Sequence, residues 1–265
     1  MRTLVGLGAI VLLGACSRSP AGQLDVSPFV PVKKEPPPPL KVLIAINASP
    51  SFNVSDPSGQ RAAAVVSLLS NLPPDASILV SAFSSSVIAN FSPSGIPEFT
   101  PLAQFTAADR AALVQKITNF GPPGTMTNVT DFVTPLRAIS DALTADLARP
   151  ESWRYEVLFV TDGAPTNDED QTLLCSPLIS GLASLSLPPN DIHLNTVFIN
   201  QAQVAPCNDA VVETRCSIQP APSGCPASIR AADELRLRRM AELGNGSFKS
   251  FRSGDAVDYA PLLVH

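Results

Sequence analysis

Charged side chains are scarce in this sequence, and the charge that it carries is acidic on balance. Asp, Glu, Lys and Arg make up 15% of the 265 residues, with 18 Lys and Arg against 23 Asp and Glu. No long run of Lys or Arg occurs. Because binding to phosphates requires a basic face, this composition argues against a nucleic-acid-binding protein. The hydrophobic share of 45% is enough for a core and excludes a wholly disordered chain.

Histidine and the common catalytic motifs are also rare. The sequence has 2 histidines, His193 and His265. Serine hydrolases need a base beside the nucleophile, and neither histidine is expected to lie near the polar loops described below. The phosphate-binding pattern G-x-x-x-x-G-K-[ST] is missing. We therefore expect a protein that is not an enzyme.

The apolar run near the N-terminus is too short to cross a bilayer, because a spanning helix needs about 20 residues. It follows Arg2 and ends at Leu-Gly-Ala-Cys, residues 13–16, which fits a signal peptide over residues 1–15. The four-residue motif resembles the lipobox of bacterial lipoproteins. That resemblance implies an acylated Cys16 at the mature N-terminus. Since Ser17 is not Asp, it further implies an anchor in the outer membrane of a bacterial cell envelope.

Four cysteines remain when Cys16 is set aside. Cys175, Cys207, Cys216 and Cys225 predict two disulfides, as is usual for an exported protein. None of them forms a C-x₂₋₄-C pair, which argues against a zinc site. Three of the four fall within residues 201–227. If all four are paired, at least one disulfide ties this insertion to the segment around Cys175.

Proline marks the boundary between a tether and a folded domain. Residues 16–40 are proline-rich, with consecutive prolines at 36–39, and predict a partly polyproline II spacer. Residues 41–253 alternate apolar strand patterns, such as 42–46 and 155–160, with helical patterns, such as 60–69 and 131–147. This alternation predicts an α/β fold, a three-layer sandwich with a mostly parallel central sheet and helices on both faces. Residues 254–265 are expected to form a C-terminal tail.

Polar residues follow the predicted strands where ligands bind in such sheets, beyond the carboxyl ends. Asn47, Ser49 and Ser51 come after the first strand, and Asp162 comes after the strand at 155–160. A loop rich in Gly, Pro and Thr, residues 121–130, precedes the helix at 131–147. Hydroxyl, amide and carboxylate oxygens are the hard ligands that Mg²⁺ or Mn²⁺ prefers.

In their order along the chain, these motifs resemble the von Willebrand factor A (VWA) domain family. The resemblance covers residues 41–251 and implies a Rossmann-like sheet with a metal-ion-dependent adhesion site. Ser49 and Ser51 match the two serines of that site, and Asp162 matches the later aspartate. Thr127 matches the threonine, with Thr125 as the alternative. The family implies binding of a protein partner through this edge.

Asn47 departs from the family pattern, which has aspartate at the first position. An amide keeps an acceptor oxygen but loses the negative charge. Two interpretations follow: a weak Mg²⁺ or Mn²⁺ site completed by a partner, or a loop held closed by the amide without metal. The first predicts an envelope lipoprotein that binds another envelope or surface protein. The second predicts a structural or assembly lipoprotein, and a metal-dependent hydrolase is a further alternative.

The insertion at residues 201–227 is much longer than the usual connection of about 2–6 residues in α/β domains. It leaves the carboxyl end of a predicted strand. We therefore expect it to rise beside the polar cluster as a rigid wall that contributes to partner specificity. The alternative is a stabilising decoration away from that edge.

Overall fold

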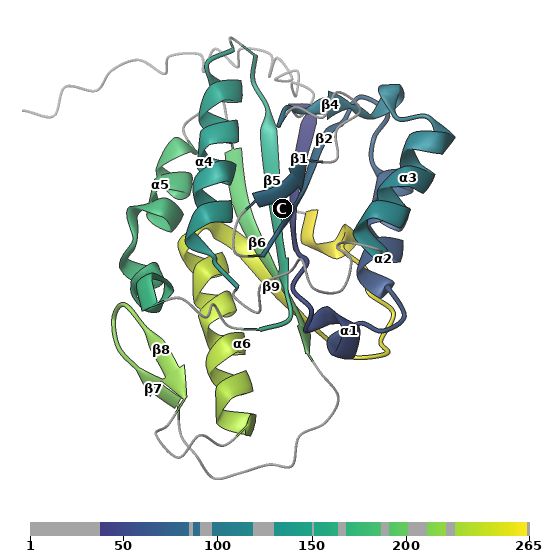
Figure 1. The fold of residues 1–265 in the computed structure, drawn as a ribbon. Helices are drawn as coiled ribbons and strands as arrows, with labels where there is room; N and C mark the ends of the chain where they lie inside the picture. Colours follow the sequence, from purple (N-terminus) through teal and green to yellow (C-terminus); the bar gives the residue numbers. More distant parts are fainter. Residues whose placement is uncertain are drawn as a thin grey trace, which may run out of the picture. The chain divides into compact units, whose positions relative to one another are not determined.

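The computed structural model describes residues 38–84, 87–90, 97–118, 130–149, 151–163, 168–186, 191–200, 211–220 and 226–263. All of them belong to one unit, Pro37–His265. Its centre is a 7-stranded sheet with the strand order β3-β2-β1-β5-β6-β9, to which β4 adds by pairing with β2 (Figure 1). The strands are β1 (Leu40–Asn47), β2 (Ser77–Phe83), β3 (Val87–Asn90), β4 (Thr100–Pro101), β5 (Arg154–Thr161), β6 (Asp191–Asn200) and β9 (Asn245–Arg252).

The inner strands run parallel and are buried on both sides. β1 pairs with β2 and β5, β5 with β6, and β6 with β9, all in parallel, while β3 and β4 pair antiparallel with β2. Every residue of β1 is buried. Such strands are typical of sheets covered on both faces, because neither side meets water. The order 3-2-1-4-5-6 in chain sequence is that of doubly wound α/β folds.

Helices cover both faces of the sheet (Figure 1). One face packs against α1 (Phe52–Ser55), α2 (Gln60–Asn71), α3 (Ala107–Thr118) and η3 (Ala260–Leu263). The other packs against α4 (Val133–Leu147), α5 (Pro177–Leu185) and α6 (Pro226–Leu243). The predicted fold class, a three-layer α/β sandwich with a mostly parallel sheet, is confirmed. None of the helices in the described ranges is long and apolar enough to cross a membrane.

The C-terminal segment contributes to the core. Tyr259 is 0% exposed, and Leu262 and Leu263 are also buried, in the layer that contains α2. The sequence predicted a C-terminal tail over residues 254–265. Three apolar side chains are nevertheless enough to hold it against the sheet.

The junction of α6 and β9 contains two closely packed glycines. α6 ends at Leu243, directly before Gly244, and the residue with positive φ is Asn245, at 55°. Gly244 is instead required by close packing, since a Cβ there would lie 2.4 Å from Cβ of Leu194. A Cβ on Gly246 would lie 2.2 Å from the Leu194 carbonyl oxygen. Two glycines thus let β9 approach β6 closely.

Candidate functional site

The structure brings four of the predicted site residues together at the carboxyl edge of the sheet. Asn47 is the last residue of β1, and Asp162 directly follows β5. Because β1 and β5 are neighbouring parallel strands, their ends meet at the same edge. Ser49 and Ser51 occupy the turn after β1. Thr125 and Thr127 lie outside the described residues, so their place in the site stays a prediction.

A chain of hydroxyl groups leads to the carboxylate. The Ser49 and Ser51 Oγ atoms are 2.6 Å apart, and Ser51 Oγ donates to Asp162 Oδ1 at 3.0 Å. Ser51 is exposed, whereas Ser49 and Asp162 are buried. Three side-chain oxygens from two loops therefore converge at one point that opens to solvent through Ser51.

Asn47 uses both ends of its amide inside the protein. It is 0% exposed; its Nδ2 donates to Thr161 Oγ1 at 3.0 Å, and its Oδ1 accepts from the Ser49 amide at 2.8 Å. The second bond forms an Asx turn that shapes the loop carrying Ser49. An aspartate at this position has no donor for Thr161. The observed contacts are therefore those of an amide that joins β1 to β5.

Ser55 is a member of the cluster that the motif did not include. Its buried Oγ donates to Asp162 Oδ2 at 2.6 Å and also lies 3.2 Å from the Ser51 carbonyl oxygen. The short helix α1 places it one turn after Ser51. The only indication of Ser55 in the sequence is that it follows Ser51 by four residues. This spacing brings the two residues together only if the segment between them is helical. We call Asn47, Ser49, Ser51, Ser55, Thr161 and Asp162 the carboxyl-edge cluster.

The positive charge of the buried Arg61 side chain acts on the carboxylate of Asp162. Burial raises the pKa of this carboxyl, and the Ser55 and Ser51 hydroxyls and the charge of Arg61 oppose the shift. Arg61 is itself buried, forms an ion pair with Asp56 at 3.2 Å and lies over the Phe52 ring. Burial lowers the pKa of Arg61, and Asp56 opposes this. The field of Arg61 stabilises an ionised Asp162 and at the same time disfavours a second cation.

The oxygen positions fit a small divalent cation, but the charge does not favour tight binding. Neighbouring ligands of an octahedral Mg²⁺ lie roughly 2.9 Å apart. The Ser49–Ser51 and Ser51–Asp162 oxygen distances are 2.6 and 3.0 Å. Asp162 is, however, the only carboxylate in the cluster, and the described residues contain no group of three or more His, Cys, Asp or Glu side chains able to hold a metal. The donor set suits Mg²⁺ or Mn²⁺ at low affinity.

Thr130 and Asp131, which precede α4, lie at the same edge, next to the end of β2. The Asp131 amide donates to the Ser84 carbonyl oxygen at 2.8 Å. The Asp131 carboxylate accepts from the amides of Val133 and Thr134, which caps the helix. This anchors the end of the loop that carries the two candidate threonines next to the carboxyl end of β2.

The described part of the cysteine-rich insertion is a hairpin beside α6 (Figure 1). It comprises β7 (Val211–Glu213) and β8 (Ile218–Pro220). The disulfide Cys175–Cys216 ties it to η2 (Asp168–Cys175), as the sequence predicted for at least one bridge. Cys207 and Cys225 lie outside the described residues, and their pairing stays a prediction, as does Cys16 acylation.

The hairpin is held mainly by the last helix. Arg236 donates to the Ile218 carbonyl oxygen, and Arg239 pairs with Glu213 at 3.1 Å. Among the described residues, no hydrogen bond or ion pair joins the hairpin to Ser49, Ser51 or Asp162. These contacts favour the decoration alternative for the hairpin itself, while residues 201–210 and 221–225 are outside the described ranges.

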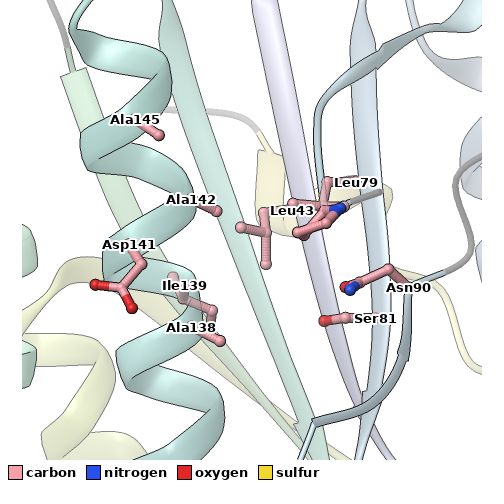
Figure 2. Close-up of a pocket in the computed structure, with 10 residues that line it drawn as sticks. Leu43, Leu79, Ser81, Asn90, Ala138, Ile139, Asp141, Ala142 and Ala145 are labelled. Atoms are coloured by element: carbon pink, nitrogen blue, oxygen red, sulfur yellow. The ribbon is translucent and has the colours of Figure 1, made fainter. Parts of the chain in front are cut away.

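A cavity of about 330 Å³ lies between α4 and the sheet (Figure 2). Leu43, Leu79 and Ile139 form apolar walls, and Asn90 and Pro97 are also part of the lining. The last two border residues 91–96, which lie outside the described ranges. We therefore assign no ligand to this cavity.

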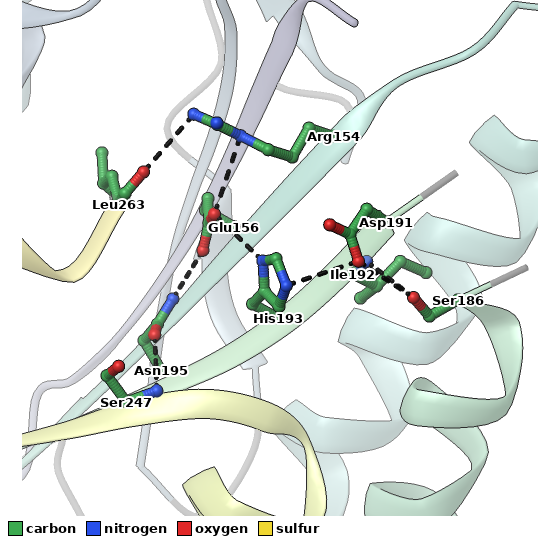
Figure 3. Close-up of polar contacts among 9 residues, drawn as sticks. All are labelled: Arg154, Glu156, Ser186, Asp191, Ile192, His193, Asn195, Ser247 and Leu263. Carbon is green, nitrogen blue, oxygen red and sulfur yellow. Dashed lines mark hydrogen bonds and ion pairs between the residues drawn. The ribbon is translucent and has the colours of Figure 1, made fainter. Parts of the chain in front are cut away.

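Charged groups gather at the opposite, amino edge of the sheet (Figure 3). Glu156 is 0% exposed and accepts from His193 Nδ1 at 3.1 Å and from Asn195 Nδ2 at 2.8 Å. Arg154 Nε lies 3.8 Å from the same carboxylate, and Asp191 lies 3.3 Å from His193 Nε2. The bond to Glu156 raises the pKa of His193 against the effect of burial. We call these five residues the amino-edge network.

Comparisons with known proteins bear on the fold alone. No family model and no curated protein matches the chain. An aerotolerance-related membrane protein from Bacteroides fragilis is 12% identical with a TM-score of 0.46, over 80% of this chain and 91% of that one. A von Willebrand factor type A protein from Catenulispora acidiphila is 14% identical with a TM-score of 0.46, over 81% of this chain and 39% of that one.

A third similar structure is proximal thread matrix protein 1 from the mussel byssus with a zinc-occupied MIDAS motif. It is 14% identical with a TM-score of 0.39, over 60% of this chain and 38% of that one. The chain thus spans well under half the length of the Catenulispora and mussel chains. These scores are too low to support a functional argument, so the fold is stated from the strand order given above.

Proposed function

We propose that this chain is a lipid-anchored protein of the bacterial cell envelope whose α/β domain binds another envelope or surface protein. Binding takes place at the carboxyl edge of the sheet and involves no catalysis. The observation that carries the proposal is the convergence of the Ser49, Ser51 and Asp162 oxygens at one solvent-facing point. With the resemblance to VWA domains, this supports a weak Mg²⁺ or Mn²⁺ site that gains a ligand from the partner's carboxylate.

A metal titration tests the site. We expect weak binding of Mg²⁺ or Mn²⁺ by calorimetry, and loss of binding in Asp162→Asn, which removes the only carboxylate. Asn47→Asp adds a second carboxylate, and about tenfold tighter binding is expected, equivalent to about 1.4 kcal/mol. If Asn47→Asp binds metal no more tightly than wild type, the proposed role of position 47 is wrong.

A crosslinking experiment tests the partner surface. A photo-reactive residue replaces Pro57, which is exposed beside α1, and in a control replaces Glu151, which is exposed at the amino edge. We expect a defined crosslinked protein from position 57 that disappears in a Ser49→Ala, Ser51→Ala double variant. Equal crosslinking from both positions contradicts binding at the carboxyl edge.

Anchoring is tested separately from binding. Cys16→Ala is compared with wild type by metabolic palmitate labelling and membrane fractionation. We expect the variant to lose both the label and its retention in the outer membrane. A variant that keeps the label contradicts the lipobox interpretation.

One observation favours a second function. The Asn47 amide bridges Ser49 and Thr161, and Ser55 occupies the other oxygen of Asp162, so the carboxyl-edge cluster is already cross-linked by hydrogen bonds. This supports a structural or assembly lipoprotein whose site holds the fold without metal. The titration separates the two functions, because the second predicts no metal binding in wild type. No such observation supports a metal-dependent hydrolase.

A further inference from the structure

The two edges of the central sheet are built differently. On one side the sheet ends in β3 and β4, which are four and two residues long, and β4 contains Pro101. On the other side it ends in β9, an eight-residue strand that pairs with β6 alone among the described strands. Short strands and proline prevent further pairing, whereas a long edge strand presents unpaired backbone groups. β9 is the edge that is able to accept another strand.

The hydrogen bonds of β9 show which backbone groups point outward. The Ser247 amide donates to Asn195 Oδ1 (Figure 3) and the Ser253 amide to the Asn200 carbonyl oxygen, each at 2.8 Å. From Ser247 onward, after the register shift opposite Leu194 and Thr196, odd-numbered residues therefore face β6. Successive residues of a strand direct these groups to opposite sides. Phe248 and Ser250 therefore direct their N–H and C=O groups away from the sheet.

The part of β9 whose outward backbone groups have no partner among the described residues ends at Arg252. Its amide donates to Asp255 Oδ2 at 2.8 Å, and its carbonyl oxygen accepts from the Asp255 amide at 2.9 Å. No other described residue bonds to the outward side of β9. The available edge thus centres on Phe248 and Ser250, which offer two donors and two acceptors.

The charged side chains of β9 itself are basic. Lys249 and Arg252 are exposed, and β9 contains no Asp or Glu. Arg238 of α6 lies over the Phe248 ring at 4.7 Å on one face, and Lys249 lies 5.9 Å from the Phe251 ring on the other. The chain as a whole carries a formal charge of −5. A basic edge on an acidic protein is complementary to an acidic strand.

We propose that the outer edge of β9 binds an extended acidic segment of a partner protein as an additional strand of the sheet. The backbone of Phe248 and Ser250 supplies the hydrogen bonds, and Lys249 and Arg252 select for acidic side chains. A second copy of this chain fits less well. Pairing two β9 strands brings Lys249 and Arg252 of both copies together without a carboxylate on either strand. The inference does not depend on the carboxyl-edge site.

Two synthetic peptides test the proposal. Both are seven residues long and carry a fluorescent label. One alternates Val with Glu, and the other alternates Val with Lys. By fluorescence anisotropy we expect the Glu peptide to bind at least about tenfold more tightly than the Lys peptide, and the difference to shrink as salt is raised. Lys249→Glu is expected to lower affinity for the Glu peptide at least about tenfold. Arg215→Glu, the same charge change at the exposed tip of the hairpin, is the matched control.

Amide hydrogen exchange separates strand addition from simple charge attraction. On binding the Glu peptide, the Phe248 and Ser250 amides should become protected. The Ser247 and Lys249 amides already face β6, and their exchange should change little. Binding without protection of the Phe248 and Ser250 amides overturns the proposal, and so does an equal loss of affinity in Lys249→Glu and Arg215→Glu. In either case the basic side chains of β9 serve only to prevent unwanted strand pairing.

Two further measurements complete the test. Asp162→Asn should bind the Glu peptide as wild type does, so failure of the carboxyl-edge proposal leaves this result unchanged. Sedimentation of the free protein should show a monomer at concentrations that saturate peptide binding. A dimer whose formation protects Phe248 and Ser250 contradicts the acidic partner and assigns the edge to self-association.

Discussion

The two ends of the central sheet both bury polar side chains, but they compensate the buried charge differently. At the amino end, basic side chains bond to the carboxylates: Lys41 pairs with Asp146 at 2.5 Å, and His193 bonds to Glu156, a contact that is an ion pair when the ring is protonated. At the carboxyl end, Asp162 has hydroxyl groups as its nearest partners. The two charges of a buried ion pair depend on each other, because removing either one leaves the other uncompensated. A carboxylate whose hydrogen-bond partners are neutral hydroxyls keeps its charge available for a further ligand, and the field of Arg61 weakens its attraction for a cation.

The largest effect is expected when the most buried pair of the amino end is broken. Lys41 is 3% exposed, bonds to Asp146, and lies 3.9 Å from the centre of the Trp153 ring. Lys41→Met keeps much of the side-chain volume but leaves Asp146 without its buried cation. We expect the free energy of unfolding to fall by about 3–5 kcal/mol in urea titrations.

The control for this variant is Lys249→Met, which removes an exposed lysine from β9 and should change stability by no more than about 0.5 kcal/mol. Asp146→Asn in the Lys41→Met background should recover part of the loss, because it removes the uncompensated charge. A loss below about 1 kcal/mol in Lys41→Met would show that the pair at the amino end is no more rigid than the hydroxyl contacts at the carboxyl end.

A smaller effect is expected at the carboxyl end. Ser55→Ala removes the hydroxyl that donates to Asp162 Oδ2 at 2.6 Å. Because the oxygen stays buried, we expect a loss of about 1–2 kcal/mol. Ser70→Ala is the matched control, since both serines bond to the carbonyl oxygen four residues earlier and Ser70 is exposed. Equal losses in the two variants would contradict a specific role of Ser55 at Asp162.

The sequence predicted the carboxyl end better than the amino end, and the reason is the range of the contacts. Asn47 and Asp162 each follow a recognisable apolar strand, so strand order alone brings them together. Lys41 opens a strand after a proline-rich segment, where a lysine is usually exposed. Its partner Asp146 is 105 residues later. No local pattern indicates that the two meet at the start of β1 and the end of α4.

Other features required knowledge of packing as well. Ser55 belongs to the site because the turn after Ser51 is helical, which a four-residue helix does not reveal in sequence. Cys175 and Cys216 pair with each other, whereas the spacing left the connectivity open. By contrast, Thr106 and Asp109 form a helix cap with bonds in both directions, and their spacing of three residues is a pattern that a sequence shows directly. Sequence patterns were sufficient where the interacting residues are close together along the chain.

A pH titration distinguishes the two ends further. The bond to Glu156 raises the pKa of His193 above its ordinary value, with Asp191 acting in the same direction and burial and Arg154 against it. The stabilisation is therefore complete below the unfolded pKa of about 6.5 and is lost as pH rises through the higher folded value. The difference in unfolding free energy between wild type and His193→Gln should be on the order of 1 kcal/mol at about pH 5.5.

That difference should decrease as the pH rises through the raised pKa of His193 in the folded protein. Ser70→Ala is the reference across the same range, because the Ser70 hydroxyl donates to a backbone carbonyl oxygen, which does not titrate. A His193→Gln difference that grows with pH would mean that the neutral ring, and not the charged one, is the form that stabilises the amino-edge network.

The smallest effect is expected from the second cation beside Asp146. Arg149 lies 3.4 Å from Asp146 Oδ1, but its side chain is 57% exposed, against 3% for Lys41. Water screens an exposed pair and the long side chain loses entropy on ordering, so Arg149→Met should cost no more than about 0.5 kcal/mol. The two variants remove a cation from the same carboxylate and differ mainly in burial. Urea titrations of Arg149→Met and Lys41→Met in parallel measure that difference directly. Comparable losses would mean that proximity to Asp146, and not exclusion of water, makes the amino end rigid.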